Sequence, residues 1–237
     1  MTLDTTLAVL LGPVPAPLPV ETIEDLDRRS DGIESTIAST VERALLGGFS
    51  ADRIGVAFAF GYRAALTRLA PNVAKRACLA ATEAGGAHPR TIRTTLREEA
   101  GAFVLDGTKS WVTLGTAAEE ILVVASTGEV DGKNRLRVVR LPADRRGVTL
   151  VARAPAPFAP EVPHSEATFQ NVHIAPNEIL PGDGYERYLK PFRTIEDLHV
   201  LAGFTGYLVS LARRGQWGNP AVEELVAFAL ADRKSVV

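Results

Sequence analysis

A glutamate on an expected helix is the first residue of this 237-residue sequence whose surroundings favour acid–base chemistry. Helical spacing puts Glu196 on one face with Phe192, Val200 and Gly203. Apolar surroundings disfavour a carboxylate anion, so the pKa of Glu196 should be raised. A carboxylic acid tuned in this way suits a general base that works near neutral pH. The alternative is that Glu196, close to the start of its helix, only stabilises the helix dipole.

A large aromatic side chain and a hydroxyl stand two positions apart on an expected β-strand. Phe103 to Leu105, a turn at Asp106-Gly107 and a returning strand from Lys109 to Leu114 predict a hairpin. Because side chains alternate along a strand, Trp111 and Thr113 should share one face with Lys109. The alternative is a plain strand pair with a buried tryptophan.

A strand and a glycine-rich turn precede this hairpin. Residues 77–81 read as a short apolar strand, and Thr82-Glu83-Ala84-Gly85-Gly86 reads as the turn that ends it. His88 follows in the loop, where a lone histidine is typical of a solvated surface position.

No metal site is expected. Glu196 and His199 form a Glu-x-x-His pair on a helix, but a di-iron site needs a second copy and further carboxylates, which the sequence lacks. His164 and His173 offer no ligand spacing. The sequence also has no Ser-His-Asp arrangement and no phosphate-binding glycine loop followed by lysine.

The elements that must position these residues begin with helices. Residues 21–47 are expected to be helical, with a break at 30–32 and a stop at Gly47-Gly48. Ser50 is expected to cap a further helix that ends near Leu69. Later in the chain, helices are expected from Pro191 to about Arg213 and from Asn219-Pro220 onward.

Between these helices the pattern changes to short strands separated by turns. Strands are expected at 121–125, 136–141, 148–151 and 167–174, with turns at Asp131-Gly132 and Arg146-Gly147 and a proline-rich loop at 152–163. The predicted fold class is therefore α+β and multi-domain: N-terminal helices, a central antiparallel β-barrel or sandwich, and the start of a C-terminal helical bundle. The expected domains are 1–76, 77–183 and 184–231.

The composition is that of a soluble globular protein, with 46% hydrophobic and 23% charged residues. A net charge of -2 gives no basic footprint for nucleic acid. The single cysteine, Cys78, excludes an internal disulfide framework and is expected to be a buried, inert thiol. No apolar run reaches the roughly 20 residues that span a bilayer, and no secretory signal is evident, so a cytoplasmic protein without membrane partners is expected.

The turn and the hairpin together resemble the acyl-CoA dehydrogenase family of flavoproteins. The family's Thr-Glu-Pro-Gly turn corresponds to Thr82-Glu83-Ala84-Gly85, and its Leu-Asn-Gly-x-Lys-x-Trp-Ile-Thr motif corresponds to residues 105–113. The resemblance continues weakly through 169–174 and 180–184 and into the next helix. It covers about two-thirds of the chain.

The resemblance implies an FAD cofactor and α,β-dehydrogenation of an acyl-CoA thioester, in which a carboxylate removes the α proton and the β hydrogen leaves as hydride to the flavin. By analogy, Trp111 would lie against the flavin, Thr113 would hydrogen-bond near its N5 atom, and Thr82 would contact its pyrimidine end. The implied partners are an electron-transfer flavoprotein and further copies of the chain in a homotetramer. The implied pathway is fatty acid metabolism.

Two departures from the family concern the substrate and the base. His88 stands where most members have a serine that contacts the cofactor pyrophosphate or the CoA arm, so the resemblance suggests His88 as a substrate-binding residue while leaving CoA itself open. A minority of the family places its catalytic base ten positions before a glycine, as Glu196 precedes Gly206. Most members place it farther into the C-terminal bundle. Asp197 stands where the minority has arginine.

The end of the sequence resembles the peptide that a common sequencing adapter encodes. Residues 232–237 are therefore expected to be a non-native tail, and the native gene is expected to continue beyond Ala231. The alternative is an ordinary frayed terminus.

The leading hypothesis is an FAD-dependent acyl-CoA dehydrogenase-like oxidoreductase acting on CH–CH bonds. A second hypothesis is a monooxygenase of the same fold that uses reduced flavin and oxygen and needs no carboxylate base. A third is an inactive relative or fragment that acts only as an assembly partner.

Overall fold

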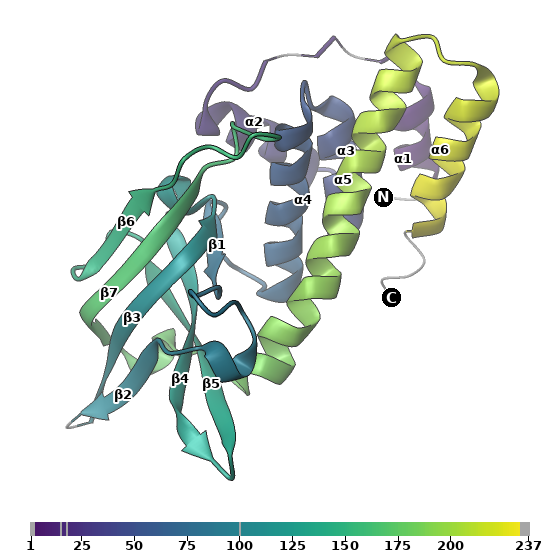
Figure 1. Ribbon diagram of the computed structural model, residues 1–237. Helices are drawn as coiled ribbons and strands as arrows, with labels where there is room; N and C mark the ends of the chain where they lie inside the picture. The colour runs from purple at the N-terminus through teal and green to yellow at the C-terminus, as the bar shows by residue number, and fades with distance from the viewer. Residues whose placement is uncertain (1–2, 15, 18, 100, 233–237) are drawn as a thin grey trace. The chain divides into compact units, whose positions relative to one another are not determined.

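The computed structural model describes residues 3–14, 16–17, 19–99 and 101–232 (Figure 1). These residues form two compact units. The helical unit comprises Met1–Pro71 and Thr194–Val237, and the β unit comprises Asn72–Arg193. Residues 233–237 of the expected non-native tail lie outside the described residues. The expected division into three domains stays a prediction.

The helical unit is built from six α-helices, the fifth of which begins in the β unit. They are α1 (Leu3–Leu11), α2 (Ile23–Glu34), α3 (Thr40–Ser50), α4 (Ile54–Leu69), α5 (Lys190–Arg214) and α6 (Asn219–Asp232). The starts of α5 and α6 and the end of α4 lie where the sequence pattern predicts them.

The N-terminal helix boundaries differ from the prediction. α2 runs through the expected break at 30–32, since a single glycine is tolerated inside a helix, and the chain breaks instead between Glu34 and Ser39. The hydroxyl of Ser39 caps α3 by accepting from the backbone N–H of Glu42. Ser50 is the last residue of α3 and does not cap α4, whose N-cap residue is Arg53 and makes no side-chain capping hydrogen bond.

Glycines allow three helices of this unit to pack with their backbones close together. A Cβ on Gly48 of α3 would overlap the carbonyl oxygen of Gly203 on α5, and one on Gly206 would overlap that of Leu45. A Cβ on Gly203 would lie 2.7 Å from the carbonyl oxygen of Ala57 on α4. These positions therefore require glycine for close approach, and not for a turn.

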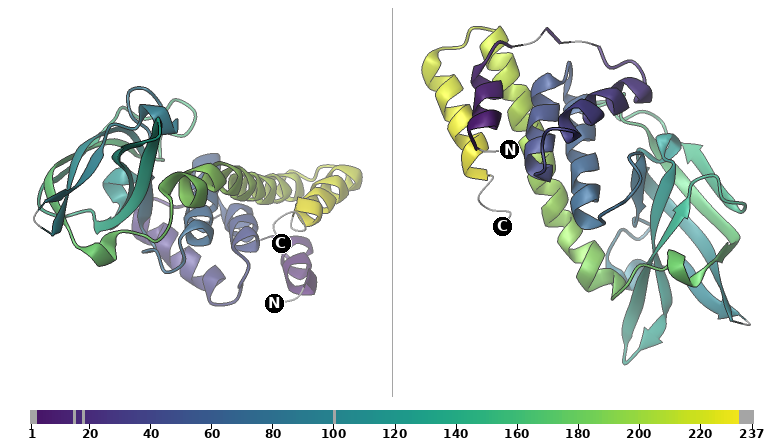
Figure 2. Two further views of the ribbon diagram at one scale, coloured as in Figure 1. Left: turned by 90° about the horizontal axis from the view of Figure 1, so that it is seen from below. Right: turned by 180° about the vertical axis from the view of Figure 1, so that it is seen from behind.

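The β unit contains one curled, mixed seven-stranded sheet (Figures 1 and 2). Its strands are β1 (Ala77–Ala80), β2 (Thr95–Glu99), β3 (Ala102–Thr113), β4 (Glu120–Val130), β5 (Lys133–Pro142), β6 (Val148–Ala152) and β7 (His164–Ile174). Their order is β1-β4-β2-β3-β7-β6, with β5 paired to β4. The sheet is mixed because β4 pairs in parallel with β1 and, at Thr95 and Ser126, with β2.

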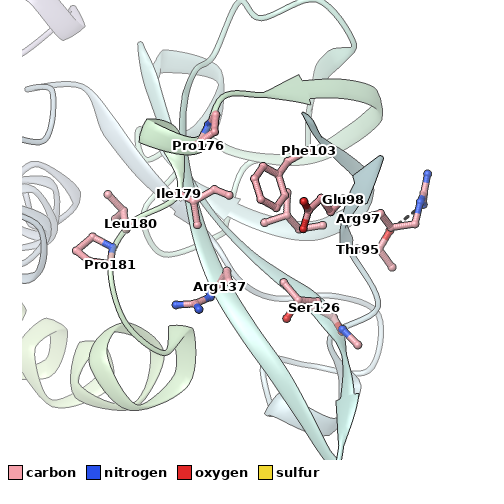
Figure 3. Close-up of a pocket in the computed structure, with 13 residues that line it drawn as sticks. Thr95, Arg97, Glu98, Phe103, Ser126, Arg137, Pro176, Ile179, Leu180 and Pro181 are labelled. Atoms are coloured by element: carbon pink, nitrogen blue, oxygen red, sulfur yellow. Dashed lines mark hydrogen bonds between the residues drawn. The ribbon is translucent and has the colours of Figure 1, made fainter. Parts of the chain in front are cut away.

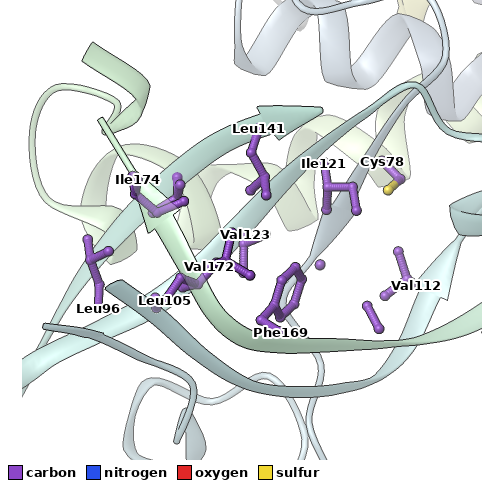
Figure 4. Close-up of a cluster of buried hydrophobic side chains, with 14 residues drawn as sticks. Cys78, Leu96, Leu105, Val112, Ile121, Val123, Leu141, Phe169, Val172 and Ile174 are labelled. Atoms are coloured by element: carbon purple, nitrogen blue, oxygen red, sulfur yellow. The ribbon is translucent and has the colours of Figure 1, made fainter. Parts of the chain in front are cut away.

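The concave interior of this sheet holds the core of the unit. Figure 4 shows apolar side chains that meet there from strands far apart in the sequence, among them Cys78, Val123 and Phe169. Burial raises the pKa of the Cys78 thiol to about 12, which fits the inert role expected for it. The α+β fold class, with helices on either side of a central β region in the sequence, is confirmed.

The expected hairpin turn at Asp106-Gly107 is wrong. β3 continues unbroken through this dipeptide, and the register with β7 shows a β-bulge between Leu105 and Gly107. Gly107 has a φ of 147°, and a Cβ there would lie 2.5 Å from the Cα of Thr94. The extra residue of this bulge lies on β7, where Asn171 has a φ of 49°, and Gly107 permits the close approach of a neighbouring segment. The partner strand is β2, joined to β3 through Gly101, which has a φ of 83°.

Other sequence-based expectations of the β unit are confirmed. Asp131 and Gly132 join β4 to β5 with φ angles of 52° and 71°, as a tight hairpin turn requires. Gly147, with a φ of 91°, lies just before β6, and the segment between Ala152 and His164 forms a loop. None of the helices described is long and apolar enough to cross a membrane.

Candidate functional site

The structure brings the glycine-rich turn against the end of β3. Thr82 forms a β-bridge with Trp111, and the backbone N–H of Ser110 donates to the carbonyl oxygen of Thr82 over 2.9 Å. Trp111 is 40% exposed, whereas Thr82 and Thr113 are half-buried. A ring that is neither enclosed nor fully solvated leaves a face on which a ligand can lie.

Lys109 does not share this face, contrary to the expectation from strand alternation. A second bulge in β3 lies between Lys109 and Val112, which pair with Ala167 and Ser165 of β7. The extra residue shifts the alternation, so that Lys109 and Val112 both point inward with no exposed surface. Trp111, by contrast, is left at the surface.

Lys109 instead forms a buried ion pair with the glutamate of the Thr-Glu turn. Its ammonium donates to Oε1 of Glu83 over 2.7 Å and to the carbonyl oxygens of Val124 and Ala81 over 2.6 and 3.3 Å. Burial lowers the pKa of Lys109 to about 8, although the Glu83 carboxylate acts in the opposite direction. The sequence analysis did not identify this pair. The only signal available was the joint occurrence of the glutamate and the lysine in the two motifs.

Glu83 also binds the loop that follows the turn. Its carboxylate accepts from the backbone N–H groups of Arg93 (2.7 Å) and Thr94 (3.0 Å). Burial acts to raise the pKa of this carboxyl, but these two hydrogen bonds and the ammonium of Lys109 together lower it, so Glu83 is an anion at neutral pH. Glu83 therefore ties β3, the turn and the 93–94 segment to one another.

His88 lies in the same loop but faces solvent. Its Nδ1 accepts from the backbone N–H of Arg90 over 3.2 Å and so caps a short 3-10 turn, Pro89–Thr91. Its role in substrate binding stays a prediction. The observed role is to shape the loop.

Glu196 belongs to the helical unit, where it is half-buried on α5. Burial raises the pKa of Glu196 to about 7, and the carboxylate of Asp197 acts in the same direction. This is the direction that its apolar surroundings predict. Its role as a base stays a prediction.

His199, three positions on, is occupied by structural contacts. It has no exposed surface, and its Nδ1 donates to the carbonyl oxygen of Ile195 over 2.7 Å. Its Nε2 therefore accepts from the hydroxyl of Thr40, at 2.9 Å. The part of the chain that the structure describes holds no cluster of three or more histidine, cysteine or acidic residues able to bind a metal.

A groove of about 810 Å³ opens where β2 diverges from β4 in the β unit. Its apolar side chains include Phe103, Ile179 and Leu180, and Figure 3 shows Glu98 beside Phe103 and Arg137 near Leu180. Arg137 also donates to the carbonyl oxygen of Gly182. An apolar groove with a few charged groups is typical of a ligand site.

Comparison with known proteins agrees with this architecture. Residues 78–172 match the family description "Acyl-CoA dehydrogenase, middle domain". A curated relative, "Probable acyl-CoA dehydrogenase YngJ" of Bacillus subtilis (strain 168), is 26% identical in an alignment of 164 residues that covers 65% of this chain and 42% of that protein. The chain thus spans about two-fifths of the length of this relative.

Solved structures share the fold at lower identity. Butyryl-CoA dehydrogenase from Megasphaera elsdenii is 18% identical with a TM-score of 0.67, and the match covers 91% of this chain and 68% of that one. The FAD complex of PigA is 16% identical (TM-score 0.67, coverage 82% and 59%). The prolyl acyl carrier protein oxidase AnaB is 19% identical (TM-score 0.65, coverage 80% and 58%).

The curled sheet with its Thr-Glu turn and Trp-bearing strand thus corresponds to the middle domain of acyl-CoA dehydrogenases. The match of residues 78–172 and the shared fold of the solved structures support the acyl-CoA dehydrogenase family as the family that this chain resembles.

Proposed function

We propose that this chain is an FAD-dependent, acyl-CoA dehydrogenase-like oxidoreductase that introduces a double bond between the α and β carbons of an acyl thioester. The observation that carries the proposal is the β-bridge between Thr82 and Trp111, which brings together two motifs 29 residues apart and leaves the indole at the surface. The match of residues 78–172 to the middle domain of acyl-CoA dehydrogenases supports the same cofactor and substrate class.

The residues at the end of β3 fit a flavin. Trp111 offers an apolar ring that is 40% exposed, and Thr82 and Thr113 add hydroxyls that are half-buried beside the same strand. We propose that Trp111 lies against the ring system and that the two threonines hydrogen-bond to its polar edge. FAD, when bound, supplies the hydride acceptor.

Glu196 is the proposed base. A carboxyl with a pKa of about 7 is partly ionised at neutral pH and can accept the α proton of the substrate. As that proton leaves to a carboxylate oxygen and the β hydrogen leaves with its electron pair, the carbon–carbon double bond forms. We include an electron-transfer flavoprotein as the physiological oxidant and self-association of the chain as parts of the same proposal.

The proposal is tested by purifying the chain and recording its visible spectrum before and after incubation with FAD. A flavin spectrum, bleached anaerobically by a member of an acyl-CoA panel, is the expected result. The variant Trp111→Ala should bind FAD more weakly. A protein that stays colourless after incubation, or a bound flavin that no acyl thioester reduces, would contradict the proposal.

A second candidate function is a monooxygenase of the same fold that takes a substrate without CoA. It is favoured by the turn at His88, whose ring nitrogen caps its own loop. The AnaB structure shows that this fold also occurs in an oxidase of a prolyl acyl carrier protein. Oxygen-dependent product formation in the presence of a flavin reductase, unchanged in Glu196→Gln, would favour this candidate over the first.

A further inference from the structure

An exposed tryptophan on a strand end rotates unless its neighbours hold it, and Trp111 has two such neighbours. The guanidinium carbon of Arg153 lies 5.0 Å from the centroid of the indole. The imidazole of His164 packs against the same ring, with centroids 4.5 Å apart and planes inclined by 33°. All three residues belong to the β unit.

Arg153 is itself fixed in place. Its Nη1 donates to the carbonyl oxygen of Ser110, next to Trp111 in the chain, over 3.0 Å and to Oε1 of Glu166 over 2.7 Å. Its backbone N–H donates to the carbonyl oxygen of His164 over 2.8 Å. Arg153 is thus hydrogen-bonded to β3, which carries the indole, and to the neighbouring β7, and its guanidinium lies at a distance typical of a cation–π contact.

His164 is held by packing more than by hydrogen bonds. It pairs with Thr113 in the β3–β7 register, and its buried Nδ1 has no hydrogen-bond partner within the described ranges. Burial lowers the pKa of His164, and the charge of Arg153 acts in the same direction, so the ring is neutral at pH 7. A neutral ring can stack on the indole beside a cation without like-charge repulsion.

We propose that Arg153 and His164 are positioning residues that fix the indole of Trp111 in one orientation before any ligand binds. The remaining exposed part of the ring is then presented to the flavin without a further cost in side-chain entropy. This second step rests on the proposed function, whereas the first step concerns the apoprotein alone.

The test uses the full chain with Trp217→Phe, because the sequence has two tryptophans and this change leaves Trp111 as the sole tryptophan, which can be excited selectively over the tyrosines. Acrylamide quenching and fluorescence anisotropy of the apoprotein report how freely the indole moves. Arg153→Met, which keeps the length of the side chain but removes its charge, should raise quenching and lower anisotropy. Arg153→Lys should restore part of both. Arg146→Met, at an exposed arginine before β6, should change neither.

His164 is tested in the same background. His164→Phe retains a flat ring and should keep the acrylamide quenching and the anisotropy of the parent. His164→Ala should raise the quenching and lower the anisotropy. If Arg153→Met leaves both readouts at the parent values, or if His164→Phe changes them as much as His164→Ala, the positioning role is overturned. Circular dichroism on each variant separates this result from loss of the fold.

FAD titration then tests the second step. Arg153→Met should weaken FAD binding about twofold to fivefold, the effect of losing one exposed cation–π contact, and Arg153→Lys should recover part of it. If Arg153→Met frees the indole in the apoprotein but leaves the affinity for FAD unchanged, the link between this positioning and flavin binding is overturned. If the parent protein binds no FAD, the proposed function fails, while the apoprotein measurements still decide the positioning role.

Discussion

The ammonium of Lys109 lies 2.7 Å from Oε1 of Glu83 inside the β unit, and this pair joins the Thr82 turn to the strand that carries Trp111. The same carboxylate accepts from the backbone of residues 93 and 94, and the same ammonium donates to Val124 on β4. One ion pair therefore determines the positions of several segments around the candidate flavin site.

Lys109→Met should destabilise the β unit by about 3 kcal/mol, because it leaves the Glu83 carboxylate buried without its cation. Urea unfolding followed by circular dichroism measures the change. Glu83→Gln should also destabilise, since Lys109 then keeps only carbonyl partners. The double variant should lose less than the sum of the two single variants, because the uncompensated charge is gone. Additive losses would show that the two side chains do not act as a pair.

The lowered pKa of Lys109 predicts a specific pH dependence of stability. Between about pH 8 and pH 10.5 the unfolded chain binds the lysine proton while the folded chain has released it. Stability attributable to Lys109 should therefore rise with pH across this window. The difference in unfolding free energy between the parent and Lys109→Met should therefore widen from pH 7.5 to 10.5. A constant difference would contradict the prediction.

Glu196→Gln should lower the rate of flavin reduction by an acyl thioester about a hundredfold to ten-thousandfold without loss of FAD binding. In the parent, the rate of flavin reduction should rise with pH through about 7 as the Glu196 carboxylate forms. This rise should be absent in Glu196→Gln. Asp197→Asn should move this rise of the rate to lower pH, because the Asp197 charge helps to raise the pKa of Glu196. If the rate still rises with pH through about 7 in Glu196→Gln, another residue is the base.

The same carboxyl should cost stability at neutral pH. Its folded pKa lies above the unfolded value of 4.5, so the folded chain binds the extra proton between about pH 4.5 and 7 and loses stability as pH rises through that range. Glu196→Gln should therefore be more stable than the parent above pH 7, as thermal unfolding at pH 5 and pH 8 would show.

Gly107→Ala tests the bulge that replaces the expected hairpin turn. A Cβ at this position meets Thr94 and the backbone has a φ of 147°, so the loss should be about 3 kcal/mol or more. Gly101→Ala is the matched control, since its φ is also positive but no atom lies within 4 Å of the added Cβ. It should cost about 1 kcal/mol. Equal losses in denaturant melts would refute the close approach to Thr94.

Gly206→Ala tests the packing of α3 against α5. The new methyl group overlaps the backbone of Leu45 and Phe49, so a net loss of about 2 kcal/mol is expected even after the gain in helix propensity. Gly32→Ala, inside α2 with no atom within 4 Å, should instead gain up to about 1 kcal/mol. A stabilising Gly206→Ala would mean that the helices are farther apart than described.

The elements were predictable where local chemistry decides them. The strands from β4 to β7 and the starts of α5 and α6 follow from apolar periodicity and from Asp-Gly, Arg-Gly and Asn-Pro signals. The turn predicted at Asp106-Gly107 is wrong because the same dipeptide occurs in hairpin turns and opposite bulges, and the partner strand decides which one forms. The break before α3 was misplaced because Gly32 is tolerated inside α2.

The candidate site was predictable only in part. The resemblance of the two motifs to the family singled out Thr82, Trp111 and Thr113, and their role toward a flavin stays a prediction. The sequence did not reveal the partners of Trp111, because Arg153, just after β6, and His164, at the start of β7, lie more than 40 positions later in the chain. It also put Lys109 on the wrong face, since one inserted residue in β3 reverses the alternation that the prediction assumed.

Cys78 has a practical consequence for following the opening of the β unit. Its thiol lies on β1 with no exposed surface and an elevated pKa, so it resists alkylation while β1 stays paired with β4. Because Cys78 is the sole cysteine, the rate at which a thiol reagent labels this chain reports how often β1 detaches from β4.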